Sequence, residues 1–116
     1  MPTQQPPAVL FDDAADTFAI LASPVRVRLL WLLARGEADV STLADSAGTT
    51  VTTASQHLAR LRQAGLVSVR SEGKRHVYVV DDPHVISLVE QALDHHDDLR
   101  SRAGVRTSKS RKVARV

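Results

Sequence analysis

Two histidines and two aspartates in the C-terminal third of the chain have a spacing that suits metal binding. Ten residues separate His84 from His95; Asp82 lies two positions before the first histidine and Asp98 three positions after the second. Asp followed by Pro is a typical helix start, so the stretch 82–102 is expected to form one helix. At about 100° per residue, His84 and His95 then share one face of the helix, about 16 Å apart along its axis.

These ligands can meet only between two chains. Zinc lies about 2 Å from its ligand atoms, so one ion cannot bridge two histidines this far apart on one helix. In an antiparallel pair of such helices related by a two-fold axis, His84 of one chain meets His95 of the other, and the dimer has two equivalent sites. Asp82 and Asp98 would complete a four-coordinate site of nitrogen and oxygen ligands. The alternative is that Asp82 is only a helix cap and that the histidines are ordinary solvated side chains.

A second group of residues, over 50–64, suits DNA. Val51, Ala54, Leu58 and Leu61 form an apolar stripe that is expected to face the core. The opposite side carries small polar and basic side chains and no acid: Thr52, Thr53, Ser55, Gln56, Arg60 and Gln63. A helix that enters the major groove needs such donors and acceptors. The alternative is a generic helical hairpin that binds no DNA.

Basic charge is concentrated in two places along the chain. Arg70, Lys74 and Arg75 surround the expected turn of a β-hairpin, where they would contact phosphates. The net charge of +2 combines −4 over residues 1–100 with +6 over 101–116. The basic tail is either a non-specific DNA anchor or a solubilising end. For the hairpin charges, the alternative is that they only form a solvated face.

The elements that carry these groups can be read from periodicity and from capping residues. Helices are expected at 11–22, at 24–35, from 39 or 41 to 47, from 49 or 50 to 64, and at 82–102, with a β-hairpin over 66–80 between the last two. Four helices, a hairpin and a helix make a mainly α (α+β) winged helix-turn-helix. A flexible N-terminus over 1–8, a single domain over 9–102 and a basic disordered tail over 103–116 complete the expected organisation.

Composition excludes several function classes. The chain has no cysteine, so disulfides, thiolate catalysis and thiolate metal sites are excluded. It has no apolar run of about 18 residues and no signal peptide at its start, so we expect a cytoplasmic protein without a membrane partner. It also lacks a Gly-rich phosphate loop and a Gly-x-Ser-x-Gly elbow, so we do not expect an enzyme.

Two stretches of the chain resemble the ArsR/SmtB repressors. They are ILASPVRVRLL over 20–30 and ASQHLARLRQAGLV over 54–67. The resemblance implies a homodimeric repressor in which the helices 11–22 and 82–102 form the dimer interface and the helix 50–64 reads an inverted-repeat operator. Thr52, Ser55 and Gln56 match the family's groove-contacting positions. His57 lies in the same stretch, and its alternative role is that of a buried polar residue at a helix packing edge.

The resemblance extends to metal sites. The family's Cys-x-Cys site aligns with Asp39 and Ser41, so an arsenite- or cadmium-type thiolate site is not expected here. The spacing of Asp82, His84 and His95 matches the interhelical site of the family's zinc, cobalt and nickel sensors. Asp98 departs from the His or Glu of that pattern, and His96 or Asp97 could replace it.

These matches imply a repressor that leaves its operator when Zn(II) binds, with Co(II) or Ni(II) as other candidate effectors. Nickel prefers more ligands than this site offers, which places zinc first. One alternative is a metal-independent repressor of the same family. Another is a winged helix that binds a protein instead of DNA.

Overall fold

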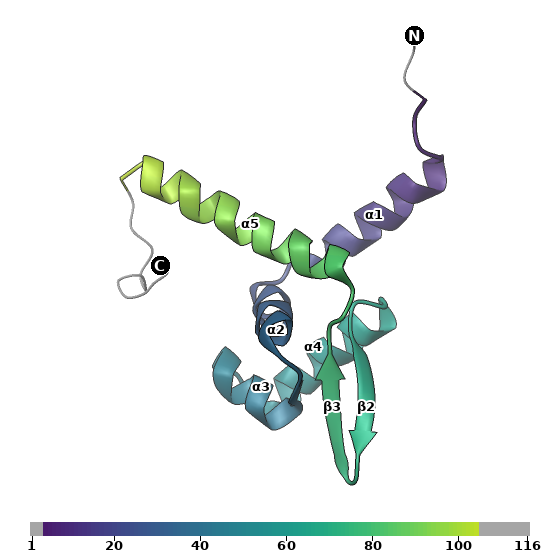
Figure 1. Ribbon diagram of the computed structural model, residues 1–116, viewed down its shortest axis with the longest axis vertical. Helices are drawn as coiled ribbons and strands as arrows, with labels where there is room; N and C mark the ends of the chain where they lie inside the picture. The colour runs from purple at the N-terminus through teal and green to yellow at the C-terminus, as the bar shows by residue number, and fades with distance from the viewer. Residues whose placement is uncertain (1–3, 105–116) are drawn as a thin grey trace.

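The computed structural model describes residues 4–104, which form five helices and three short strands (Figure 1). In chain order these are α1 (Ala8–Leu21), α2 (Pro24–Arg35), β1 (Ala38–Asp39), α3 (Val40–Ala47), α4 (Val51–Gln63), β2 (Ser68–Glu72), β3 (Arg75–Val79) and α5 (Pro83–Arg102). The expected mainly α winged helix-turn-helix is confirmed. Most of the predicted basic tail, residues 105–116, lies outside the described residues.

The core lies between α2, α3 and α4 and the base of the sheet. Leucines of these three helices are almost completely buried: Leu29, Leu30, Leu43, Leu58 and Leu61. Burying each such side chain stabilises the fold by about 1.5–3 kcal/mol. From α5, only Val85 and Val89 are buried, so its C-terminal half leaves the core.

Side-chain caps begin four of the helices where the sequence predicts them. In each case a side-chain oxygen accepts a hydrogen bond from a backbone N–H in the first turn, which would otherwise be unpaired. The caps are Ser23 for α2, Asp39 for α3, Thr50 for α4 and Asp82 for α5.

Glycine shapes the turn between α3 and α4. Gly48 has φ 69°, a left-handed conformation that suits a residue without Cβ. The following N–H, of Thr49, returns to the Ala44 carbonyl at 3.0 Å and closes the helix end. Thr50 then caps α4, so a three-residue turn sets the angle between the two helices.

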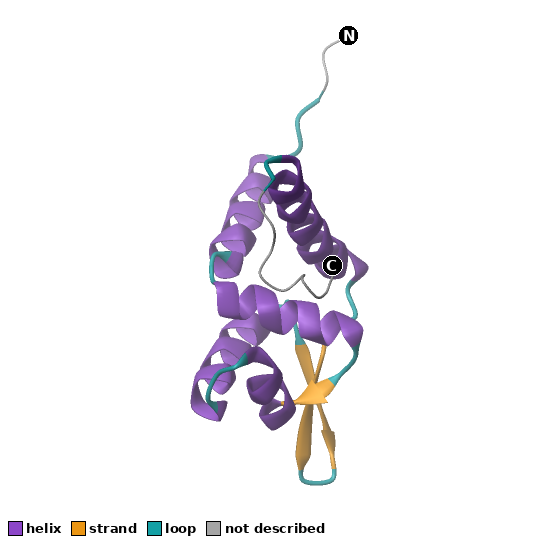
Figure 2. Cartoon of the chain, turned by 90° about the vertical axis from the view of Figure 1, so that its left-hand side faces the viewer, coloured by secondary structure: helices purple, strands orange, loops and turns teal. Residues whose placement is uncertain are grey.

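The sheet has one strand more than the sequence predicts. Its order is β1-β3-β2, all antiparallel, with Ala38 opposite Tyr78 and Ser68 opposite Val79. The missed strand, β1, has two residues, too few to show a period. The β2–β3 hairpin extends below the helices as the wing, with Gly73 and Lys74 at its tip (Figure 2).

The helices α1 and α5 extend away from the core in different directions (Figure 1). No residue of α1 is buried, and Phe11 and Phe18 are 55% and 59% exposed. Leu93 and Leu99 on α5 are exposed as well. Within residues 4–104 no single helix has the length and apolar composition of a membrane span. Taken together, α1 and α2 have that length and composition, but the pair is bent by 96°.

Candidate functional site

The outer side of α4 carries the polar side chains that the sequence predicts. Thr52, Ser55, Gln56 and Arg60 are exposed, whereas Ala54, Leu58 and Leu61 are buried in the core. The prediction that Val51 faces the core is wrong, because this side chain is 49% exposed. Val51 is the first residue of α4 and lies ahead of the turn that reaches the core. The exposed polar surface of α4 has no acid to repel phosphate.

Two predicted DNA contacts on α4 are occupied within the protein. Thr53 is half-buried, and its hydroxyl lies 3.0 Å from that of Thr50. His57 is also half-buried, and its Nδ1 accepts a hydrogen bond of 3.1 Å from Nε of Arg26 on α2. Arg26, the partner of His57, is half-buried, whereas Thr50, the partner of Thr53, is an exposed cap residue, but both side chains differ from the four exposed ones in having a partner within the chain.

The wing carries its three cations, but acids of the same chain hold two of them. Arg70 bonds to Glu37, between α2 and β1, and to Glu72 on its own strand. Arg75 lies 3.1 Å from an Asp39 oxygen. The hydrogen bond from Arg70 lowers the pKa of Glu37, and the bonds to Glu37 and Glu72 raise the pKa of Arg70.

Among the described residues, Lys74 has no ion pair, and it lies at the tip of the wing. Lys74 is therefore the wing cation that could meet a phosphate without first losing a partner.

At the start of α5, Asp82 and His84 form a local pair. Asp82 Oδ1 accepts a hydrogen bond of 2.8 Å from the His84 backbone N–H, and the same oxygen lies 3.0 Å from the ring Nδ1. These contacts, the backbone bond first, lower the pKa of Asp82. The His84 side chain is 94% exposed. With the ring proton on Nδ1, the Nε2 lone pair is left facing solvent.

The other two predicted ligands lie in the second half of α5. The His95 ring packs edge-on against the His96 ring, with centroids 5.0 Å apart. Asp98 Oδ2 accepts a hydrogen bond of 2.8 Å from Arg102 one turn later. In the described part of one chain, no three side chains that bind metals lie together. The structure thus separates His84 from His95, as the spacing predicts.

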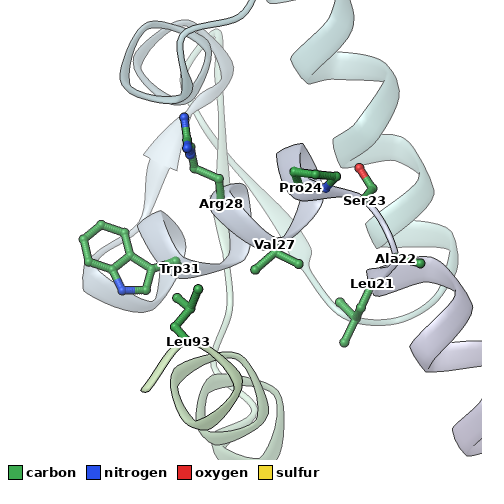
Figure 3. Close-up of a pocket in the computed structure, with 8 residues that line it drawn as sticks. All are labelled: Leu21, Ala22, Ser23, Pro24, Val27, Arg28, Trp31 and Leu93. Atoms are coloured by element: carbon green, nitrogen blue, oxygen red, sulfur yellow. The ribbon is translucent and has the colours of Figure 1, made fainter. Parts of the chain in front are cut away.

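An apolar cavity of about 540 Å³ lies where the α1–α2 junction and α2 meet α5 (Figure 3). Its lining residues are Leu21, Ala22, Ser23, Pro24, Val27, Arg28, Trp31 and Leu93. Beside it, the Arg35 guanidinium stacks on Trp31 at 4.4 Å and forms an ion pair with Glu90 of α5. Sequence reasoning missed the cavity because residues about 70 positions apart form it.

Comparison with known proteins agrees with this architecture. Residues 23–69 match the model of the family described as "Bacterial regulatory protein, arsR family". The HTH-type transcriptional regulator KmtR of Mycobacterium tuberculosis is 41% identical over 78 residues, which cover 67% of this chain and 60% of KmtR. A cadmium resistance transcriptional regulatory protein, the CadC homolog of Staphylococcus aureus, is 37% identical over 90 residues, 77% of this chain and 74% of the homolog.

A solved structure extends the similarity to the whole domain. It is a homodimeric winged helix-turn-helix DNA-binding domain from Mycobacterium bovis, described as a possible ArsR-family transcriptional regulator. It has 34% identity and a TM-score of 0.72, and it covers 87% of this chain and 95% of its own. The matched proteins are transcriptional regulators and not enzymes, and the chain belongs to the ArsR family of bacterial regulatory proteins.

Proposed function

We propose that the protein is a homodimeric transcriptional repressor that leaves its operator when a divalent metal, zinc first, binds between two α5 helices. The arrangement of Asp82 and His84 carries this proposal. A carboxylate that accepts a hydrogen bond from Nδ1–H while Nε2 stays exposed is the arrangement that metal-ligating histidines usually have.

DNA binding rests on α4 and the wing. The exposed Thr52, Ser55, Gln56 and Arg60 supply donors and acceptors for base edges, while Lys74 would contact a phosphate. In a dimer the two α4 helices would enter successive major grooves about 34 Å apart, which requires an inverted repeat. We place Thr53 and His57 behind this surface, since each already has a partner inside the protein.

Dimerisation through α1 and α5 is supported by their uncovered apolar side chains and by the homodimeric relative. An antiparallel α5 pair would bring His84 of one protomer to His95 of the other. The two histidines and Asp98 are ligands that zinc accepts and that also fit Co(II), and Asp82 could join them as the fourth ligand only after it releases the His84 ring.

Ligands for a softer metal are absent from this protein. One relative is named for cadmium resistance, but this chain has no cysteine to supply a thiolate. Ni(II), which prefers more ligands, would need His96 or Asp97 to enlarge the site, and either residue could also take the place of Asp98.

Release from DNA would follow from a restraint on the dimer. Two α5 helices tied through shared ions are held at one relative rotation, and the attached α4 helices then no longer match the groove spacing. Such coupling is reciprocal and typically amounts to about 1–3 kcal/mol, so bound operator weakens metal binding by the same factor.

One contact favours a different function. Arg102 already holds Asp98, and a metal must displace it before this carboxylate can become a ligand. The second candidate is therefore a metal-independent ArsR-type repressor with the same DNA surface.

The test is a titration of the dimer on labelled DNA from upstream of its own gene, followed by fluorescence anisotropy with and without zinc. We expect zinc to weaken binding by about 5–150-fold in wild type and to have no effect on His84→Ala/His95→Ala. His76→Ala, which removes an exposed histidine on β3, is the matched control and should respond to zinc like wild type. Equal DNA affinity with and without zinc would overturn the sensor and leave the repressor. A protein that binds no DNA at all would overturn both.

A further inference from the structure

Arg26 lies where three helices meet. It belongs to the first turn of α2, and the Ser23 cap accepts its backbone N–H. Its guanidinium Nη1 donates to the Ile20 carbonyl of α1 at 2.9 Å, and its Nε donates to Nδ1 of His57 on α4 at 3.1 Å. One half-buried side chain therefore links the end of α1 to the middle of α4.

We propose that Arg26 and His57 are a positioning pair that sets the orientation of α4, and thereby DNA affinity, without touching DNA. The inference rests on the proposed DNA-binding role of α4. It goes further by assigning the residues that hold this helix in register with α1.

The chemistry of the pair suits this role. The Ile20 carbonyl is one of the last four of α1, which have no partner within their helix, so a donor from outside satisfies it. A guanidinium has five N–H donors in a rigid plane and no acceptor. His57 must therefore present a lone pair on Nδ1 and carry its proton on Nε2.

Packing against the apolar core does not by itself fix the rotation of α4 about its own axis. Ala54, Leu58 and Leu61 hold α4 against the core through apolar contacts, which are not directional. A hydrogen bond weakens steeply when its angle departs from linearity, so the bond to His57 restricts rotation of α4 about its own axis. Gln56 precedes His57 in the chain, and its exposed amide moves with any such rotation.

Two substitutions at His57 separate positioning from packing. His57→Asn keeps an acceptor oxygen near the place of Nδ1, whereas His57→Leu has a similar bulk and no acceptor. We expect His57→Leu to lose about tenfold in affinity for the upstream DNA and His57→Asn to stay within about threefold of wild type. Urea unfolding of each variant confirms that it is folded at the temperature of measurement.

A double-variant cycle tests whether the two residues act through each other. We expect Arg26→Met to lose about tenfold in affinity for the upstream DNA. The double variant Arg26→Met/His57→Leu should lose no more affinity than either single variant. Arg28→Met, which removes the exposed arginine two positions along α2, is the matched control and should bind like wild type. The dependence of log K on log salt should keep its wild-type slope in Arg26→Met, because no phosphate contact is lost.

Three results would overturn the inference: equal losses for His57→Asn and His57→Leu, additive losses in the double variant, or a salt slope reduced by about one in Arg26→Met. The last result would make Arg26 a phosphate contact. Wild-type protein that binds no DNA is a failure of the proposed function, so the two failures are distinguishable.

Discussion

Two aspartates, 43 positions apart, each cap a helix through a side-chain oxygen that accepts a backbone N–H of the first turn. Asp39 accepts the Thr42 backbone N–H at 2.9 Å at the start of α3, and Asp82 accepts that of His84 at the start of α5. A backbone hydrogen bond to the ionised carboxyl is the largest cause that lowers each pKa. Negative charge is also favoured at a helix N-terminus.

These lowered pKa values predict how stability depends on pH. The folded pKa of Asp39 lies below the ordinary value of 3.8, so its contribution is complete above that value and is lost as pH falls through the folded pKa. Asp39→Asn keeps an acceptor but cannot titrate, so its free energy of unfolding should fall less than that of wild type below pH 3.8. Urea unfolding followed by circular dichroism at several pH values measures this.

Asp45→Asn, an exposed carboxyl on the same helix, is the control for this experiment and should keep the wild-type pH dependence. Parallel acid curves for Asp39→Asn and wild type would show that the cap does not contribute to the pH dependence.

At the scale of elements, the wing that we propose to contact DNA is also part of an ion-pair network. Glu37 and Asp39 approach β2 and β3 from the chain around β1 and hold Arg70 and Arg75. The pairs are exposed, so each adds little stability. We expect their larger effect to be on DNA binding, because a phosphate would have to compete with a carboxylate that is already in place.

Removing one of these acids should therefore strengthen DNA binding. In Glu37→Gln, Arg70 loses a charged partner. We expect severalfold tighter DNA binding and a slope of log K against log salt concentration that is steeper by about one. Glu90→Gln breaks the Arg35 ion pair between α2 and α5 and is the control away from the wing, with no expected change in the salt slope. Weaker binding by Glu37→Gln would mean that the Arg70–Glu37 bond holds the wing in its binding position.

At the scale of the whole molecule, the single chain leaves apolar surface uncovered. An isolated helix of 14 residues is marginal in water, and within one chain no side chain of α1 is fully buried, although Ile20 and Leu21 at its end pack partly against the core. On α5, Leu93 and Leu99 are exposed as well, and Leu93 lines the apolar cavity together with Leu21 at the end of α1. A second copy that covers these faces would stabilise α1 and complete the proposed metal sites.

A charge on this surface should separate the protomers. We expect Phe18→Asp to elute as a monomer in size-exclusion chromatography with light scattering, and to lose zinc binding, because each site needs two chains. Val51→Asp places the same charge at an exposed apolar residue of α4 and should remain a dimer. A dimeric Phe18→Asp protein that binds zinc would exclude α1 from the interface.

Local signals in the sequence were sufficient to predict the helices, their caps and the family. Apolar periodicity, and Ser, Thr or Asp before four of the helices, depend on neighbours within a few positions, and the structure confirms them. The exception is α1, which has no side-chain cap and begins at Ala8, three positions before the predicted start. The exposed side of α4 follows from the same periodicity, whereas the two-residue strand β1 and the exposed Val51 do not.

Contacts between side chains that are far apart in the chain could be found only from the tertiary structure. Arg26 meets His57 across 31 positions, and Arg70 meets Glu37 across 33. Spacing in the sequence predicts contacts along one helix or across one hairpin, but such pairs depend on how separate elements pack. That is why the sequence could place Arg70, Arg75 and His57, while only the fold shows that the two arginines and the Nδ1 lone pair of the histidine already have partners.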